Sequence, residues 1–132
     1  MTLGEEPLRY VAVAIGALLG ANLRFVLVNW AAELWGAEFP YGTFLVNVSG
    51  AFVIGFFLAF IGARASVSPL WRLFFATGFL GGYTTFSSYA WDALLLAEDG
   101  AWARALLYVG GSNGLGLAGV WLGATLARLS TR

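Results

Sequence analysis

The sequence predicts an all-α membrane protein with four transmembrane helices, the third of which is broken near its middle. Of the 132 residues, 60% are hydrophobic and only 11% are charged, and the mean hydropathy is +0.80. A water-soluble core of this size cannot bury so much apolar surface. The apolar residues fall into four stretches of about the length that crosses a bilayer core. Glycine and hydroxyl residues interrupt the third stretch.

The four apolar stretches cover about residues 8–31, 41–63, 70–97 and 102–127. Each connection between them is short and contains a residue that ends helices, namely Pro40, Pro69 and Gly100 in turn. We therefore expect a single domain over residues 1–132, a multi-pass protein of the cell membrane with both chain ends on one side.

Small residues four apart could let these helices approach closely. The pairs are Gly16/Gly20, Gly78/Gly82, Gly110/Gly114 and Gly119/Gly123. Such pairs also arise by chance in a chain with 18 glycines.

The third stretch contains the segment Gly78-Phe-Leu-Gly-Gly-Tyr-Thr-Thr-Phe-Ser-Ser-Tyr89, with three glycines and four hydroxyl residues in twelve positions. Glycine is entropically costly in a helix, and Ser and Thr side chains compete for backbone hydrogen bonds. Inside a bilayer, irregular backbone survives only where it is buried in protein or lines a polar cavity. The segment is therefore the first candidate for a functional site.

The composition excludes several kinds of function. There is no histidine and no cysteine, and the formal net charge is +0, which argues against His/Cys metal sites, thiol chemistry and nucleic-acid binding. We expect no enzyme activity. Within the spans, the only acid is Asp92, near the end of the third, while the first carries Arg24. A small proton-coupled multidrug exporter, the alternative transporter class, would need an embedded acid in the first span.

Neutral hydrogen-bond donors and aromatic rings share helix faces in three of the spans. The pairs are three or four residues apart: Thr43 with Asn47, Phe86 with Tyr89, and Tyr108 with Ser112. Amide and hydroxyl donors can replace the water around an anion without holding it as tightly as a fixed charge. The positive edge of an aromatic ring can solvate an anion too. The pattern favours a small-anion pathway, but it also suits hydrogen bonding and packing between helices in a non-transporting structural subunit.

Two stretches resemble the signature of the Fluc (CrcB) fluoride channels. They are Gly42-Thr-Phe-Leu-Val-Asn-Val-Ser-Gly50 and the Gly78–Tyr89 segment, and Gly16-Ala-Leu-Leu-Gly-Ala-Asn-Leu-Arg24 resembles the family as well. The resemblance covers essentially the whole chain. It implies a fluoride-selective channel that exports fluoride passively across the cell membrane.

The resemblance also implies an assembly and a set of site residues. Members of this family are antiparallel dimers of two inverted subunits, with two fluoride pathways and a central structural sodium ion. The expected partners are thus fluoride, membrane lipid and a second copy of the chain. The implied fluoride pathway comprises Asn47, Phe86, Tyr89 and Ser112, with Thr43, Ser87 and Tyr108 as weaker candidates. Arg24 would lie near the mouth of the vestibule, and the backbone carbonyls of Gly81 and Thr84 would bind the sodium.

The chain departs from the family's pattern at two points. Tyr89 stands where the family has the second of two phenylalanines, so this ring carries a hydroxyl group. The arginines also favour one orientation, because most lie on the side of the chain ends: Arg9, Arg64, Arg72, Arg128 and Arg132, against Arg104 on the other side. Either one chain inserts both ways to form a homodimer, which we expect because it carries every motif, or it pairs with a second, oppositely inserted subunit.

Overall fold

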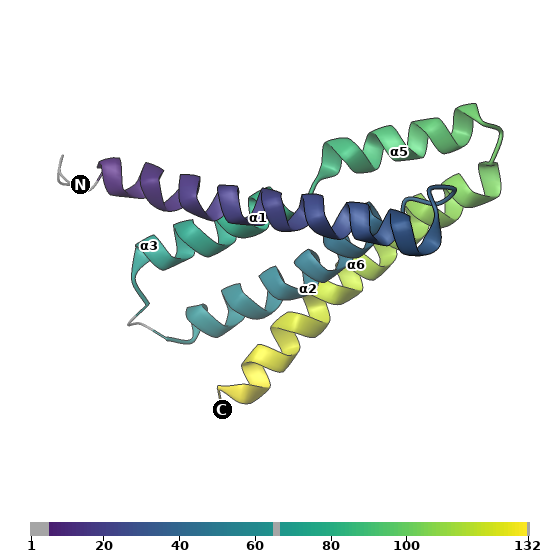
Figure 1. The fold of residues 1–132 in the computed structure, drawn as a ribbon. Helices are drawn as coiled ribbons and strands as arrows, with labels where there is room; N and C mark the ends of the chain where they lie inside the picture. Colours follow the sequence, from purple (N-terminus) through teal and green to yellow (C-terminus); the bar gives the residue numbers. More distant parts are fainter. Residues whose placement is uncertain (1–5, 65–66, 132) are drawn as a thin grey trace.

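The computed structural model describes residues 6–64 and 67–131, and these form helices and short connections without any strand (Figure 1). Arg132 lies outside the described residues. The elements in chain order are α1 (Glu6–Trp35), α2 (Tyr41–Gly62), α3 (Pro69–Arg72), the π-helical segment η1 (Leu73–Leu80), α4 (Gly81–Tyr83), α5 (Phe86–Glu98) and α6 (Trp102–Ser130). The prediction of an all-α chain is confirmed.

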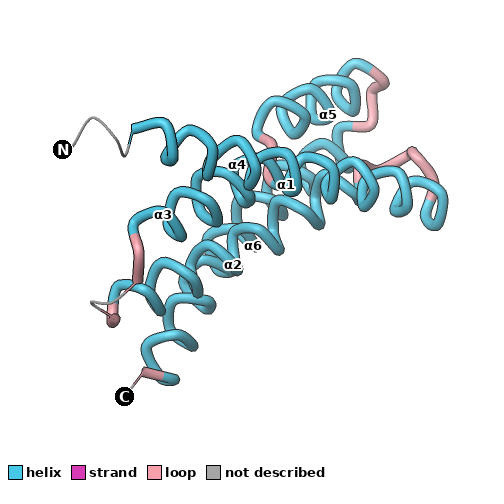
Figure 2. Tube along the Cα trace, turned by 60° about the vertical axis from the view of Figure 1, so that its left-hand side comes forward, coloured by secondary structure: helices cyan, strands magenta, loops and turns pink. Residues whose placement is uncertain are grey.

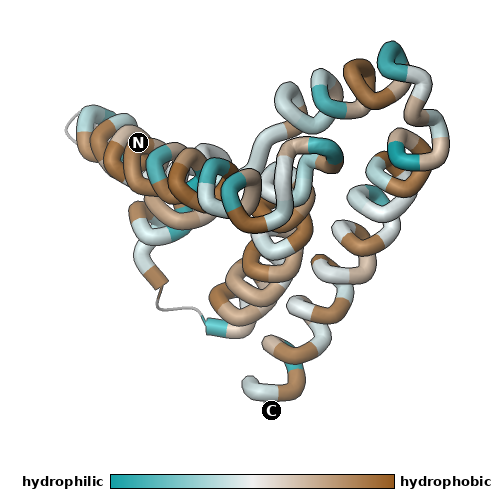
Figure 3. The backbone as a smooth tube through the Cα atoms, turned by 45° about the vertical axis from the view of Figure 1, so that its right-hand side comes forward, coloured by the Kyte–Doolittle hydropathy of each residue, from teal (hydrophilic) through white to brown (hydrophobic). Residues whose placement is uncertain are grey.

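Three unbroken helices among the described residues, α1, α2 and α6, are long and apolar enough to cross a membrane. They match the first, second and fourth predicted stretches to within a few residues. The tube of Figure 3 carries many brown, hydrophobic stretches, which alternate with paler turns along α6, the helix that ends at the label C. The apolar surface of these three helices is therefore available to face lipid.

The third predicted stretch is helical in pieces. Pro69 lies at the first position of α3, where its missing N–H costs nothing, and the Ser68 side chain accepts a hydrogen bond from the Leu70 amide. The helix then continues through η1 and α4 and ends at Thr84 and Thr85, whose backbones are extended. The predicted break near the middle is confirmed, although it falls on the two threonines. Gly81 keeps helical angles, with φ −64° and ψ −35°.

Gly78 and Gly82, before the break, serve close packing against α1 rather than the break itself. A Cβ atom on Gly82 would come within 2.6 Å of the Ala17 carbonyl oxygen, and one on Gly20 within 2.9 Å of the Tyr83 nitrogen. Figure 2 shows α4 lying against α1 in this region. The predicted close approach is thus confirmed for the pairs on α1 and the third segment, and for Gly119/Gly123 on α6, where a Cβ on Gly123 would collide with the Phe52 carbonyl oxygen of α2. In contrast, nothing lies within 4 Å of a Cβ built on Gly110 or Gly114.

Helix α5 stands apart from the rest of the bundle. α2 packs along much of α6, and α1 packs along η1, whereas α5 has contacts only with α6 and α2. In Figures 1 and 3, α5 projects away from α1 beyond the break. This arrangement leaves an open face between α5, α2 and α6.

Candidate functional site

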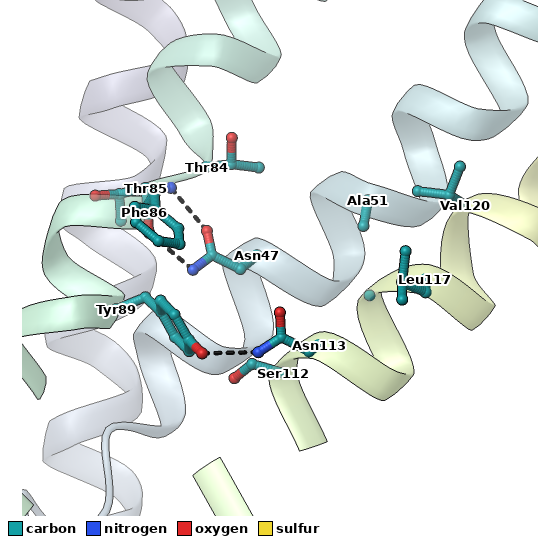
Figure 4. Close-up of a pocket in the computed structure, with 11 residues that line it drawn as sticks. Asn47, Ala51, Thr84, Thr85, Phe86, Tyr89, Ser112, Asn113, Leu117 and Val120 are labelled. Atoms are coloured by element: carbon teal, nitrogen blue, oxygen red, sulfur yellow. Dashed lines mark hydrogen bonds between the residues drawn. The ribbon is translucent and has the colours of Figure 1, made fainter. Parts of the chain in front are cut away.

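The break is fixed by the side chain of one residue on another helix. The Asn47 amide nitrogen donates to the Thr85 carbonyl oxygen at 2.9 Å, and the Thr85 backbone nitrogen donates to Asn47 Oδ1 at 2.7 Å (Figure 4). Asn47 Oδ1 replaces the Gly81 carbonyl as acceptor for the Thr85 amide, and Asn47 Nδ2 gives the Thr85 carbonyl an additional donor from another helix. Because an unpaired backbone group costs several kcal/mol in hydrocarbon, Asn47 makes the irregular backbone tolerable at this depth.

Both sides of the break have local caps. Thr84 Oγ1 donates to the Leu80 carbonyl at 2.9 Å, closing the end of α4. Thr85 is the N-cap of α5, and its Oγ1 accepts from the Ser88 amide at 3.2 Å. The amide of Thr85, which would bond to the Gly81 carbonyl in a continuous helix, donates to Asn47 instead. The carbonyls of Gly81 and Thr84 are thereby left without their usual helical donors.

A pocket of about 320 Å³ lies beside the break, between α2, α5 and α6. Figure 4 shows its lining residues. They are Asn47, Ala51, Thr84, Thr85, Phe86, Tyr89, Ser112, Asn113, Gly116, Leu117 and Val120. None of these described lining residues carries a fixed charge. The four main residues of the predicted pathway are thus brought together around one uncharged cavity.

Ser112 contributes an unpaired donor to this pocket. Its Oγ atom is buried and has no hydrogen-bond partner among the described residues. Buried hydroxyl groups are nearly always hydrogen-bonded, because burying one without a partner costs about 1–3 kcal/mol. The hydroxyl group is therefore available to a ligand in the cavity.

Aromatic rings line one side of the pocket and continue away from it. The ring centroids of Phe86 and Tyr89 are 5.5 Å apart, and those of Tyr89 and Tyr108 are 5.4 Å apart. Tyr108 is fully buried and Thr43 nearly so. The Tyr108 hydroxyl donates to Asp92 Oδ2 at 3.2 Å. Asp92 in turn lines a second pocket, of about 460 Å³.

The second pocket lies where α2 begins and α5 ends. It is lined by Asp92 and Asp99 and by a surface ion pair, in which Arg104 is 3.0 Å from Glu38. Tyr89, Tyr108 and Asp92 thus form a continuous row of contacts from the uncharged pocket to a second pocket that is lined by charged residues.

Besides Thr43, Tyr108 and Gly81, the predicted residues Ser87 and Arg24 also lie outside the uncharged pocket. Ser87 is exposed on α5, and its Oγ is 3.3 Å from Thr85 Oγ1, so it belongs to the N-cap. Arg24 is half-buried on α1, and its side chain makes no hydrogen bond or ion pair within the described part of the chain.

Two features of the site were not predicted from the sequence: the pairing of Thr85 with Asn47, and the contribution of Asn113. Thr85 was visible as a polar residue in the break, but nothing in the spacing connects it to a residue 38 positions earlier. Asn113 directly follows Ser112, and an amide inside a predicted span was the signal that could have identified it.

The sequence matches the family described as "CrcB-like protein, Camphor Resistance (CrcB)" over residues 11–124. The chain belongs to the CrcB family. It is 54% identical over 119 residues to the "Fluoride-specific ion channel FluC" of Roseiflexus sp. (strain RS-1), covering 90% of this chain and 96% of the relative. A protein of the same name from Acidobacterium capsulatum is 46% identical over 88% of this chain and 93% of its own length. One from Sulfurihydrogenibium sp. is 40% identical over 92% and 98%.

The match extends over nearly the full length of these CrcB relatives, which are named as ion channels and not as enzymes. Together with the three long apolar helices, it identifies the chain as a multi-pass membrane protein of a channel family.

Replacing Thr85 by valine tests the cap of α5 in this CrcB chain. We expect Thr85→Val to lower the free energy of unfolding by about 1 kcal/mol, because the side chain no longer accepts from the Ser88 amide. Thermal unfolding in detergent, followed by helicity, measures the loss. Thr125→Val is the matched control, since Thr125 Oγ1 bonds only within α6, to the Trp121 carbonyl. An equal loss in the two variants would contradict the assignment.

Proposed function

We propose that this chain is a passive, fluoride-selective channel that exports fluoride across the cell membrane. The relatives named as fluoride-specific ion channels support fluoride as the conducted ion. The observation that carries the proposal is the buried, unpaired Ser112 hydroxyl in an uncharged pocket with Asn47, Phe86 and Tyr89. A small anion that has lost its water would supply the missing acceptor.

The chemistry of the pocket suits an anion that is hard to dehydrate. An amide nitrogen carries two hydrogens. Asn47 donates one of them to the Thr85 carbonyl, so the other can be donated to the ion. Ser112 adds an O–H donor, and the rings of Phe86 and Tyr89 add their positive edges. Without a fixed charge in the lining, the ion is bound weakly enough to leave again. Chloride is larger and easier to dehydrate than fluoride, so short hydrogen bonds from these donors stabilise it less.

The pathway would continue from Tyr89 along the buried stripe of Tyr108 and Thr43. Ser87, at the cap of α5, is a further donor beside the break. Arg24 is not among the residues of the single-chain pocket, and its proposed place is near the mouth of the vestibule. There its positive charge would concentrate anions at the entrance without trapping them deep in the pore.

The proposed assembly is an antiparallel homodimer in which each chain crosses the membrane four times, with α3, η1, α4 and α5 together forming the third crossing. The Phe86 ring is 79% exposed in the single chain, although it lines the pocket, so one subunit leaves the pathway incomplete. An inverted copy packed on the open face would close both pockets at once, giving two pathways per dimer.

The proposed structural sodium ion would be held by the carbonyl oxygens of Gly81 and Thr84. Backbone carbonyl oxygens are ligands that suit a hard cation, and within residues 6–64 and 67–131 there is no group of three or more acidic side chains that could hold a metal. Both carbonyls lack their usual helical donors, and a Cβ on Gly81 would meet nothing within 4 Å. The donor set therefore fits a hard monovalent cation, which would tie the two breaks together at the dimer axis.

The function is tested with purified protein in liposomes. We expect fluoride to leave loaded liposomes down its gradient while chloride is retained, as an ion-selective electrode records. Equal chloride release, or release of neither ion, would contradict the proposal. Proton uptake that depends on an organic cation would instead favour a multidrug exporter.

Removing a donor from the pocket should slow the flux. We expect Asn47→Ala and Ser112→Ala each to reduce fluoride efflux about tenfold or more, since a hydrogen bond to an ion contributes about 1.5–3 kcal/mol. Efflux from liposomes with equal protein content measures this. Ser130→Ala is the control, because Ser130 bonds only to the Ala127 carbonyl of its own helix. Wild-type efflux in both pocket variants would remove them from the pathway.

Sodium removal tests the cation site. When sodium is replaced by a large organic cation that two carbonyls cannot enclose, we expect fluoride efflux or dimer formation to fall. Efflux and crosslinking are compared in the two salts at equal ionic strength. Unchanged values in both measurements would argue against the carbonyl site.

A further inference from the structure

Asn113 connects α6 to the ring of Tyr89. Its amide nitrogen Nδ2 lies 2.7 Å from the Tyr89 hydroxyl oxygen and 2.8 Å from the Val109 carbonyl oxygen (Figure 4). Both residues line the uncharged pocket. Asn113 is the neighbour of Ser112 along the chain, so two adjacent residues of α6 present polar groups to one cavity.

The Val109 carbonyl determines which way the Asn113 amide points. A carbonyl oxygen can only accept a hydrogen bond, so the amide nitrogen, and not the amide oxygen, must face it. The same nitrogen is the atom next to the Tyr89 hydroxyl. With one N–H directed to Val109, the other is left for Tyr89.

It follows that Tyr89 is the acceptor in this pair. A phenol hydroxyl carries a single hydrogen. Because the lone pair facing Asn113 is occupied, that hydrogen points to another direction, and the described residues offer it no acceptor. The Tyr89 O–H is therefore a donor with a fixed orientation and without a partner, like the hydroxyl of Ser112.

We propose that Asn113 is a positioning residue that orients the Tyr89 hydroxyl as a hydrogen-bond donor to the anion in the pocket. This rests on the proposed channel function and adds a specificity determinant to it. The ring edge alone solvates an anion weakly, whereas an oriented O–H makes a short, charge-assisted bond that a small anion uses best. Asn113 contributes by removing the alternative hydroxyl orientations in advance, and does not itself touch the ion.

The test measures fluoride efflux from liposomes as a function of fluoride concentration for four variants. We expect Tyr89→Phe and Asn113→Leu both to conduct, each with the half-saturating fluoride concentration raised about tenfold. The double variant should match Tyr89→Phe, because Asn113 acts only through the hydroxyl. Asn22→Leu is the matched control and should behave as wild type, since Asn22 makes the same bond within its helix, to Leu18 at 2.7 Å, and none to another helix.

A second measurement follows the hydroxyl directly. The Tyr89 ring carbon that bears the hydroxyl group, labelled with 13C and assigned by its absence in Tyr89→Phe, should shift on addition of sodium fluoride. The shift should be retained in Asn22→Leu and largely lost in Asn113→Leu. Asn113→Ala replaces Asn113→Leu if the latter does not purify with the wild-type oligomeric state.

The outcomes separate this inference from the proposed function. If the wild type releases no fluoride, the channel proposal fails. If the wild type conducts but Asn113→Leu has the wild-type half-saturating fluoride concentration, the positioning role is overturned. It is also overturned if the double variant has a higher half-saturating concentration than Tyr89→Phe. An equal fluoride-induced shift in wild type and Asn113→Leu, or no shift in either, overturns it as well.

Discussion

The paired hydrogen bonds between Asn47 and Thr85 are the constraint on which the rest of the site depends. A helix interrupted inside a bilayer must find partners for its backbone groups, and a single amide side chain supplies a donor and an acceptor at the required place. The two bonds end α4, start α5 and turn α5 away from α1. They also divert the Thr85 amide from the Gly81 carbonyl, so the same two bonds shape both the proposed anion site and the proposed cation site.

The parts of the third segment before and after the break pack in different ways. Gly78 and Gly82 lack the Cβ atoms that would collide with α1, so the first half of the segment packs tightly there. Beyond the break, the rings of Phe86 and Tyr89 line the uncharged pocket. Small residues thus anchor one half, while aromatic residues on the other half line the pocket.

Much of this could be predicted from the sequence, because hydropathy and helical spacing are local properties. They gave the four apolar stretches, the interruption of the third, and the shared faces of Thr43 with Asn47 and Phe86 with Tyr89. The exact position of the break is not a local property: the backbone stays helical through Gly81 and Gly82, and Thr84 and Thr85 become extended where Asn47 can bond to the Thr85 backbone. Asn113 was missed because its partner Tyr89 lies on another helix, at a distance that no periodicity encodes. The proposed dimer and its proposed cation would depend on contacts between chains, which the pattern of a single chain does not encode.

The order of Asn47 and Thr85 along the chain has a consequence for biosynthesis. Proteins emerge from the ribosome N-terminus first, and Asn47 precedes Thr85 by 38 residues. When the third segment reaches the membrane, α1 and α2 have already been synthesised. The Asn47 side chain, which pairs with the Thr85 backbone at the break, is therefore already present. The partner of the broken helix is therefore present before the break enters the membrane, and α6, which follows in the chain, then adds its residues to the wall of the pocket.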